Sequence, residues 1–367
     1  MPSNEMSTEE LQRRCTESPH VLDCVLDLVQ RYCDLGRYND ALELCRSAMK
    51  HHSREYGFML EFANVLCRRG DYRESRVVFE RLTGIAPERI EAWNNLGMLE
   101  LSADNPEAAN AAFCKVLEID PQNAGALCNT GNYFAEQGDA KQAAACFERA
   151  LSLRPGFTEA WYNLGNAYMS LGWFGSAKEA FTKAIHCDGA FGSAYKNLGF
   201  VCEQIGEFDQ ALECYGKAAA QNRTDAGVQV NMAGIYMRYE QYGKALECGK
   251  RAASLAPGDP SSWNALRRAA MRLGDGHSYY RAIVALINAI GDDDLAHGIT
   301  DLRQMGFALE AEELVEYAVK INKGSEPMDA LPFVESRAPR LEGSAAANTH
   351  IYRGGGSKKS VADGAGH

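Results

Sequence analysis

Apolar residues recur along the chain with two periods, a short one that fits one face of a helix and a long one of 34 residues. The fragments Ala160–Gly165 (AWYNLG) and Ala194–Gly199 (AYKNLG) lie 34 residues apart, and Ala92–Gly97 (AWNNLG) lies 68 residues before the first of them. Extending this register gives eight consecutive units without an insertion. They begin at Leu22, Tyr56, Ile90, Ala124, Thr158, Gly192, Ala226 and Pro260. A repeated unit is therefore the organising feature of the sequence.

Each unit has the pattern of two helices joined by a turn. Positions four, seven and eleven are apolar and share a face of a first helix, and positions twenty, twenty-four and twenty-seven do the same on a second helix. Small residues at positions eight and twenty predict close approach of the two backbones, and Gly138-Asp139 is a typical turn between them. Proline at position thirty-two ends the second helix. One such hairpin cannot bury its apolar faces alone, so the units are expected to stack.

The pattern weakens towards both ends of the array, and the first two units match it less well. Gly249 replaces the aromatic residue at position twenty-four of the seventh unit, which predicts an under-packed second helix. The register is expected to slip after Gly274, before an apolar helix over Tyr279–Ile290. A degenerate capping unit starts near Asp292. Five of its residues have the types expected at their positions of the repeat, which we call the columns of the repeat: Leu302, Gly306, Ala311, Val315 and Ala318.

These patterns divide the chain into three parts. Residues 1–21 form an N-terminal flank, residues 22–323 the repeat array, and residues 324–367 a glycine-rich tail without the pattern, which is expected to be flexible.

The 34-residue columns resemble those of the tetratricopeptide repeat, whose pattern is W-x2-L-G-x2-Y…A-x3-F…A…P. The resemblance covers Leu22 to Lys323. It implies an all-α, right-handed α-solenoid of about eight to nine helix-turn-helix units, with the first helices on the concave side. In that family, positions two, five, six, nine, twelve and thirteen tend to face the groove.

A row of asparagines occupies these groove positions. Position six is asparagine in five successive units, and position nine in two: Asn95, Asn129, Asn163, Asn197 and Asn231, then Asn132 and Asn166. An asparagine amide both donates and accepts, so the row is expected to bind the backbone of an extended peptide. The row resembles that of O-linked N-acetylglucosamine transferases, although no catalytic domain follows the array. The alternative is that these amides bond neighbouring helices to each other.

Variable groove positions are expected to supply selectivity. Apolar contacts would come from Met98, Tyr162, Met169 and Phe200, and positive charge from Lys196, Arg238, Arg268 and Arg272. The N-terminal half carries Asp23, Asp27, Asp34 and Glu61. One hypothesis is a groove graded from acidic to basic, which would orient a ligand with its acidic segment over units six to eight. The alternative is solvated charge without a partner. The carboxylate clamp of chaperone-binding members is incomplete, because Phe200 replaces asparagine beside Lys196.

The chemistry of the remaining residues does not point to an enzyme. The sequence shows no metal-ligand spacing, no phosphate-binding loop and no nucleophile with a base in register, so no cofactor is expected. A net charge of −11 argues against a nucleic-acid partner, and no apolar run is long enough to span a membrane. Twelve cysteines without a disulfide pattern favour a reducing, cytoplasmic location.

The sequence therefore predicts a non-enzymatic scaffold or adaptor that binds an extended protein segment in its groove. Two alternatives remain open: a scaffold that assembles with itself, and the regulatory subunit of a larger protein complex.

Overall fold

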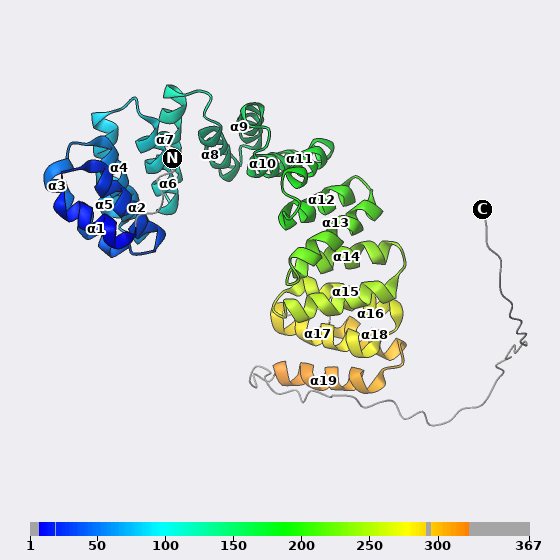
Figure 1. Cartoon of the computed structure of the whole chain (residues 1–367). Coiled ribbons are helices and arrows are strands. Elements are labelled where there is room, and N and C mark those ends of the chain that lie inside the picture. The colour runs from blue at the N-terminus through cyan, green and yellow to red at the C-terminus, as the bar shows by residue number, and fades with distance from the viewer. Residues whose placement is uncertain (1–6, 19, 291–294, 323–367) are drawn as a thin grey trace, which may run out of the picture. The chain divides into compact units, whose positions relative to one another are not determined.

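The computed structural model describes residues 7–18, 20–290 and 295–322. In these residues it has nineteen α-helices and no strand, which confirms the all-α class (Figure 1). Each helix from α1 (Thr8–Glu17) to α17 (Gly276–Ile290) packs against the next one in the chain, which for α17 is α18 (Leu295–Gln304), as expected of a solenoid. The described residues up to Ala318 belong to one compact unit. No helix in the described residues combines the length and the apolar character needed to cross a lipid bilayer.

The helices after α1 come in pairs, and the first helix of each pair begins where a sequence repeat begins. The first helices are α2 (Leu22–Asp34), α4 (Tyr56–Arg69), α6 (Ile90–Ser102), α8 (Ala124–Glu136), α10 (Thr158–Ser170), α12 (Gly192–Gln204), α14 (Ala226–Arg238) and α16 (Pro260–Leu273). The second helices are α3 (Tyr38–His52), α5 (Tyr72–Ile85), α7 (Pro106–Ile119), α9 (Ala140–Leu153), α11 (Phe174–Cys187), α13 (Phe208–Gln221), α15 (Tyr242–Leu255) and α17 (Gly276–Ile290).

The expected slip after Gly274 is wrong. Helix α17 begins at Gly276, which is position seventeen of its unit, as in the other pairs. Tyr279 replaces the small residue of position twenty and is buried, with Ile283 buried at position twenty-four. The register was misjudged because the residue types change while the spacing stays the same.

The last pair, α18 and α19 (Ala308–Asn322), follows the degenerate pattern, although its expected start near Asp292 lies outside the described residues. The register assigned Val315 to the packing column of its second helix. The buried residue there is its neighbour Leu314, whereas Val315 is exposed.

Within a pair, an aromatic ring lies directly on a glycine. A Cβ added to Gly165 would lie 2.6 Å from the ring of Phe181, which is less than a van der Waals contact allows. The same contact joins positions eight and twenty-four in three more pairs: Gly97 with Phe113, Gly131 with Phe147, and Gly199 with Tyr215. The rings themselves are fully buried. The glycines are therefore needed because the ring occupies the space that a side chain would take.

Proline at position thirty-two and tryptophan at position four are bonded across the junction between repeats. The indole N–H of Trp161 donates to the carbonyl oxygen of Pro155 at 2.8 Å, and Trp93 and Trp263 donate in the same way to Pro87 and Pro257. Each bond joins the end of one unit to the first helix of the next. Proline therefore does more than end a helix here, because its carbonyl also fixes the tryptophan ring.

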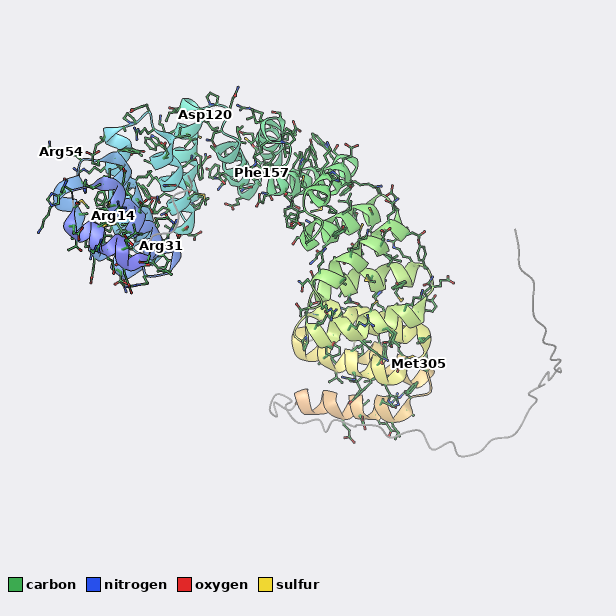
Figure 2. All side chains as sticks on the ribbon, viewed as in Figure 1. Arg14, Arg31, Arg54, Asp120, Phe157 and Met305 are labelled. Atoms are coloured by element: carbon green, nitrogen blue, oxygen red, sulfur yellow. The ribbon has the colours of Figure 1, made fainter. Side chains whose placement is uncertain are left out.

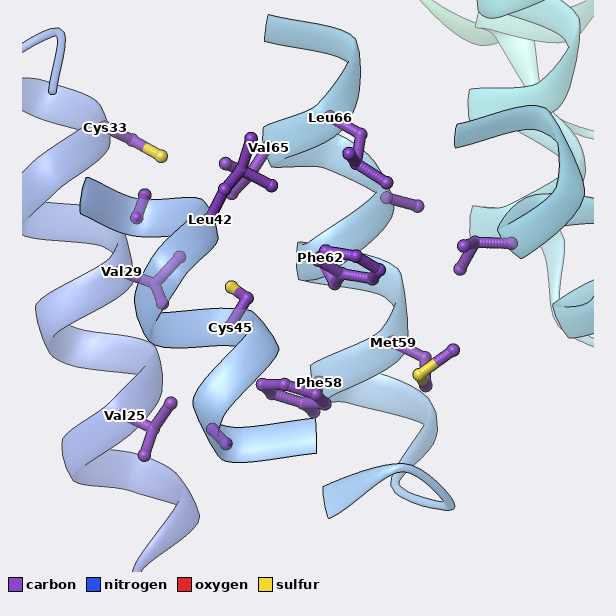
Figure 3. Packing of buried hydrophobic residues seen from close by; sticks show 14 of the residues in the cluster. Val25, Val29, Cys33, Leu42, Cys45, Phe58, Met59, Phe62, Val65 and Leu66 are labelled. Carbon is purple, nitrogen blue, oxygen red and sulfur yellow. The ribbon is translucent and has the colours of Figure 1, made fainter. Parts of the chain in front are cut away.

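In the first and seventh pairs, position eight carries a residue larger than glycine and position twenty-four a residue smaller than an aromatic ring, whereas the second pair keeps Phe79 with Ala63. In the first pair, Val29 occupies position eight and the smaller Cys45 occupies position twenty-four, and both belong to the N-terminal core (Figure 3). In the seventh pair, Ala233 occupies position eight and Gly249 occupies position twenty-four. In the first pair this exchange of volume keeps the interior filled.

The expectation that Gly249 leaves α15 under-packed is wrong. Gly249 is buried, and a Cβ built on it would lie 2.7 Å from the Cα of Leu266 in α16. The backbone of the next first helix therefore takes the space that an aromatic ring fills in other repeats.

The turn within each pair needs a left-handed backbone at position fifteen. Glycine supplies it in six of the first eight units, for example Gly172 with a φ of 74°. Asp104 and Glu240 occupy the same position with φ of 60° and 57°. The loops between repeats, two of which contain Asp120 and Phe157 (Figure 2), lack this requirement, because the positive φ values of the described residues fall only on the turns within pairs.

We expect Glu240→Gly to stabilise the protein by about 1 kcal/mol. A left-handed conformation is strained for a residue with a Cβ, and glycine removes that strain. The change is measured as a shift of the urea-unfolding midpoint. The matched control Gly172→Ala should lower the midpoint, because it introduces the same strain in another pair. A lower midpoint for Glu240→Gly would contradict the assigned turn conformation.

Restoring the aromatic residue of the repeat pattern at position twenty-four should destabilise the seventh pair. We expect Gly249→Phe to lower the free energy of unfolding by about 1–3 kcal/mol, because the α16 backbone occupies the space of the ring. The control Glu247→Phe places the same residue on the exposed face of α15 and should change it by less than about 0.5 kcal/mol. If Gly249→Phe raised the thermal-unfolding midpoint, α15 would be under-packed after all.

Candidate peptide-binding surface

The expected groove positions lie on helices that contact one another. Helix α10 contacts the first helices on both sides, α8 and α12, and contacts of the same kind join α2 with α4, α4 with α6, and α14 with α16. Residues at positions six and nine of adjacent units therefore lie next to each other, mostly half-buried. We call the residues at positions two, five, six, nine, twelve and thirteen of these helices the first-helix surface.

Asparagines of adjacent helices form pairs on this surface. The Nδ2 of Asn163 donates to Oδ1 of Asn132 at 2.8 Å, and the Nδ2 of Asn197 donates to Oδ1 of Asn166 at the same distance. A third pair joins Asn95 to Asn64 at 2.9 Å. Asn64 was missed in the sequence analysis, although it stands at position nine of its unit. In each pair, position six donates to position nine of the preceding unit.

The residue at position nine decides whether a pair forms. Asn129 meets Met98 there, and its Nδ2 lies 3.8 Å from the sulfur, a weak contact. Asn231 follows a unit with Phe200 at position nine, and its Nδ2 instead donates to the hydroxyl of Tyr215 at 3.2 Å. The five asparagines of position six are thus divided: three are paired with asparagine, and two are not.

The pairs leave part of each amide available for a ligand. A carboxamide has two N–H groups and an oxygen that accepts. Within the described residues, no hydrogen bond uses the Oδ1 of Asn163 or Asn197. Each pair therefore holds an amide in a fixed orientation and still presents an acceptor. The two interpretations of the asparagine row, as bonds between helices and as ligand contacts, are compatible.

Tyr162 and Lys196 are both engaged in contacts within the protein. The Tyr162 hydroxyl accepts from Asn197 at 3.3 Å, and its ring packs on Phe191. Lys196 forms a 2.7 Å ion pair with Asp225, which caps the N-terminus of α14. Burial raises the pKa of Asp225, but the Lys196 ammonium and the backbone N–H groups of the cap outweigh it and bring the pKa below its ordinary value.

All three of the expected arginines line one pocket. A cavity of about 430 Å³ opens between α12, α14 and α16. Its lining includes Arg238, Arg268 and Arg272 together with Glu203, Met237 and Glu240. Most of these residues stand at positions nine, twelve and thirteen, so the pocket belongs to the first-helix surface. The guanidinium of Arg238 also lies 5.2 Å from the ring centre of Phe208.

Glu203 is held in place by a hydrogen-bond relay. Asn231 donates to the hydroxyl of Tyr215, which donates to the Oε2 of Glu203 at 3.3 Å. Burial, and then the Glu203 carboxylate, raise the pKa of Tyr215, which keeps its hydroxyl protonated as a donor. Glu203 was not among the residues expected from the sequence, although its position twelve is a groove column.

Exposed apolar side chains complete the surface. Met98 and Leu101 on α6, Phe200 on α12 and Met271 on α16 are each at least a third exposed. Met169 on α10 is half-buried. In the described residues, no cluster of three histidine, cysteine, aspartate or glutamate side chains is arranged to hold a metal ion.

Five models of the tetratricopeptide repeat match the chain. They cover residues 32–98, 90–123, 131–172, 158–190 and 192–225. The matches run through the part of the chain that carries the asparagine pairs. No curated protein matches the chain significantly.

Several solved structures resemble the chain. PilF of Pseudomonas aeruginosa is 20% identical with a TM-score of 0.50, over 57% of this chain and 95% of PilF. YrrB, described as a TPR protein with an unusual peptide-binding site, is 24% identical with a TM-score of 0.47, over 51% of this chain and 96% of YrrB. MamA is 25% identical with a TM-score of 0.43, over 44% of this chain and 95% of MamA. The likeness to PilF shows the fold.

The asparagine pairs should stabilise the junctions between repeats. We expect Asn197→Ala to lower the free energy of unfolding by about 1 kcal/mol, because it removes the bonds to Asn166 and Tyr162 and leaves the Asn166 oxygen without its donor. Urea unfolding followed by circular dichroism measures the change. Asn129→Ala is the matched control and should cost less than about 0.5 kcal/mol, since it removes only a contact with sulfur. Equal effects of the two substitutions would argue against a role of the pairs in stability.

Proposed function

Because the chain carries tetratricopeptide repeats, we propose that it is a non-catalytic scaffold that binds an extended segment of another polypeptide along its first-helix surface. Stacked repeats of this kind form extended surfaces that suit such a ligand. The main support is the row of oriented amides on α8, α10 and α12, which offers hydrogen bonds without regard to the side chains of the ligand.

The spacing of the row suits an extended chain. Packed helices lie roughly 8–10 Å apart, and three residues of extended peptide span about 10 Å. One amide would therefore meet the backbone at about every third residue of the ligand. Each bond contributes about 1 kcal/mol, so several together hold a peptide of low sequence selectivity. The row is similar in residue type to that of O-linked N-acetylglucosamine transferases, and only this mode of binding is carried over.

Apolar contacts would add affinity beside the amides. Methionine adapts its shape to different partners, and Met98 and Met271 are half exposed on the surface, at 52% and 50%. Phe200 offers a face for stacking or for an apolar side chain. These contacts favour a protein or peptide ligand over a small polar metabolite.

Asn129→Ala separates the role in binding from the role in folding, because Asn129 has no asparagine partner. The probe is an array of synthetic peptides of about ten residues, long enough to span three first helices. We expect the purified chain to bind some of these peptides, and Asn129→Ala to weaken the affinity about fivefold while the free energy of unfolding changes by less than about 0.5 kcal/mol. Fluorescence anisotropy with the best peptide measures the affinity.

The control Asn110→Ala lies on the second helix α7 and should leave the affinity unchanged. An array without any bound peptide would contradict the proposed function, as would equal affinities for Asn129→Ala and the wild-type chain. Light scattering adds a further check: growth of the molar mass with protein concentration would favour self-assembly as the function of the first-helix surface.

A further inference from the structure

We propose that the pocket lined by Arg238, Arg268 and Arg272, here called the arginine pocket, binds an aspartate or glutamate side chain of the ligand. This inference rests on the proposed binding of an extended peptide and names the chemistry of one ligand position. It is carried by the geometry of the pocket, by its unpaired charge, and by its continuity with the amide row.

The pocket opens because one side chain is missing. Position nine of the seventh unit is Gly234, and a Cβ added there would meet no atom within 4 Å. The same column carries Asn166 and Phe200 in the two preceding units. A glycine inside a helix costs about 1 kcal/mol relative to alanine. Here it does not serve close packing, as Gly165 does, but leaves open space beside Arg238.

The three arginines share no anion within the described residues. No carboxylate lies within 4.0 Å of their guanidinium groups, whereas Lys178, Lys196 and Arg76 each have such a partner. Arg268 and Arg272 are four residues apart on one helix, a spacing at which like charges repel. A bound anion would remove this repulsion, and a guanidinium binds a carboxylate with two parallel hydrogen bonds.

The charge of the lining favours a carboxylate over a phosphate. Three arginines and the two glutamates, Glu203 and Glu240, leave a net formal charge of +1. One carboxylate neutralises this charge, whereas a phosphate dianion would exceed it beside a glutamate that Tyr215 holds in place. The two glutamates also exclude a ligand with several adjacent acidic residues. The pocket is therefore expected to select a single acidic side chain.

The arginine pocket continues the amide row along the chain. The row runs over α8, α10 and α12 at positions six and nine, and the pocket lies between α12, α14 and α16 mainly at positions nine, twelve and thirteen. A peptide whose backbone is bound by the amides would reach the pocket with its next residues. The acidic side chain would then fix the register and the direction of the peptide.

The test uses the peptide array in a scanning format, in which each position of the best peptide is replaced in turn by glutamate, aspartate, glutamine, phosphoserine or lysine. We expect one position to prefer glutamate or aspartate. Replacing that glutamate by glutamine should weaken binding to the wild-type chain about tenfold, as the loss of a charged hydrogen bond implies. The same replacement should change the affinity of the double variant Arg268→Gln/Arg272→Gln by less than about twofold.

Gly234→Leu gives a second variant that does not depend on the charges. Leucine fills the opening and is a better helix former than glycine, so the fold should be kept. This variant should lose the preference for glutamate while the rest of the peptide still binds. The control Arg251→Gln removes an exposed arginine from the second helix α15 and should keep the tenfold preference.

The outcomes distinguish the two proposals. If no peptide of the array binds the wild-type chain, the proposed function fails and the arginine pocket with it. If peptides bind but no position prefers an acidic residue, only the inference about the pocket fails. It fails equally if phosphoserine binds better than glutamate, or if the preference persists in Arg268→Gln/Arg272→Gln and in Gly234→Leu.

Discussion

The contact of a ring with a glycine backbone is the constraint on which the rest of the structure depends. The ring of Phe181 lies where a side chain of Gly165 would be, and the same arrangement recurs in neighbouring pairs. It sets how closely the two helices of a pair approach, and it places the large buried surface between them rather than on the outer face of the first helix. The first helices can therefore expose polar and apolar side chains without loss of core. In these four pairs, the same packing therefore shapes both the core and the first-helix surface.

Much of the fold could be predicted from the sequence because residues that make the same packing contact recur at the same position of each repeat. Gly165, Phe181 and Pro155 are separate columns of the repeat, and their spacing was enough to predict the helices. Their direct contacts were not predicted, because a column shows which residue type recurs but not which atom it meets. The Trp161 indole bond to the Pro155 carbonyl is one example. The Gly249 prediction failed for the same reason: one missing ring was interpreted as a gap, whereas the α16 backbone fills the space.

The residue types of the candidate site could be predicted from the sequence, but the hydrogen-bond and ion-pair partners of these residues could not. The asparagines of position six were visible in the sequence, but their partners depend on position nine of the unit before, as Asn163 and Asn132 show. Lys196 was expected to offer a free charge, and the structure pairs it with Asp225. Arg238, Arg268 and Arg272 were grouped from the sequence by their charge alone. That these arginines share a pocket with Glu203 depends on the approach of three helices, which no single position of the repeat shows.

The departures from the pattern gather where the amide row ends. Phe200 replaces asparagine at position nine, so Asn231 turns to the buried hydroxyl of Tyr215, and Tyr215 in turn holds Glu203 at the wall of the arginine pocket. One substitution thus ends the row of paired amides and positions a charged residue for a different kind of contact. Gly234 in the next unit then opens the space itself. Under the proposed function, the regular positions of the array would bind the backbone of a ligand, and a local break in them would recognise one of its side chains.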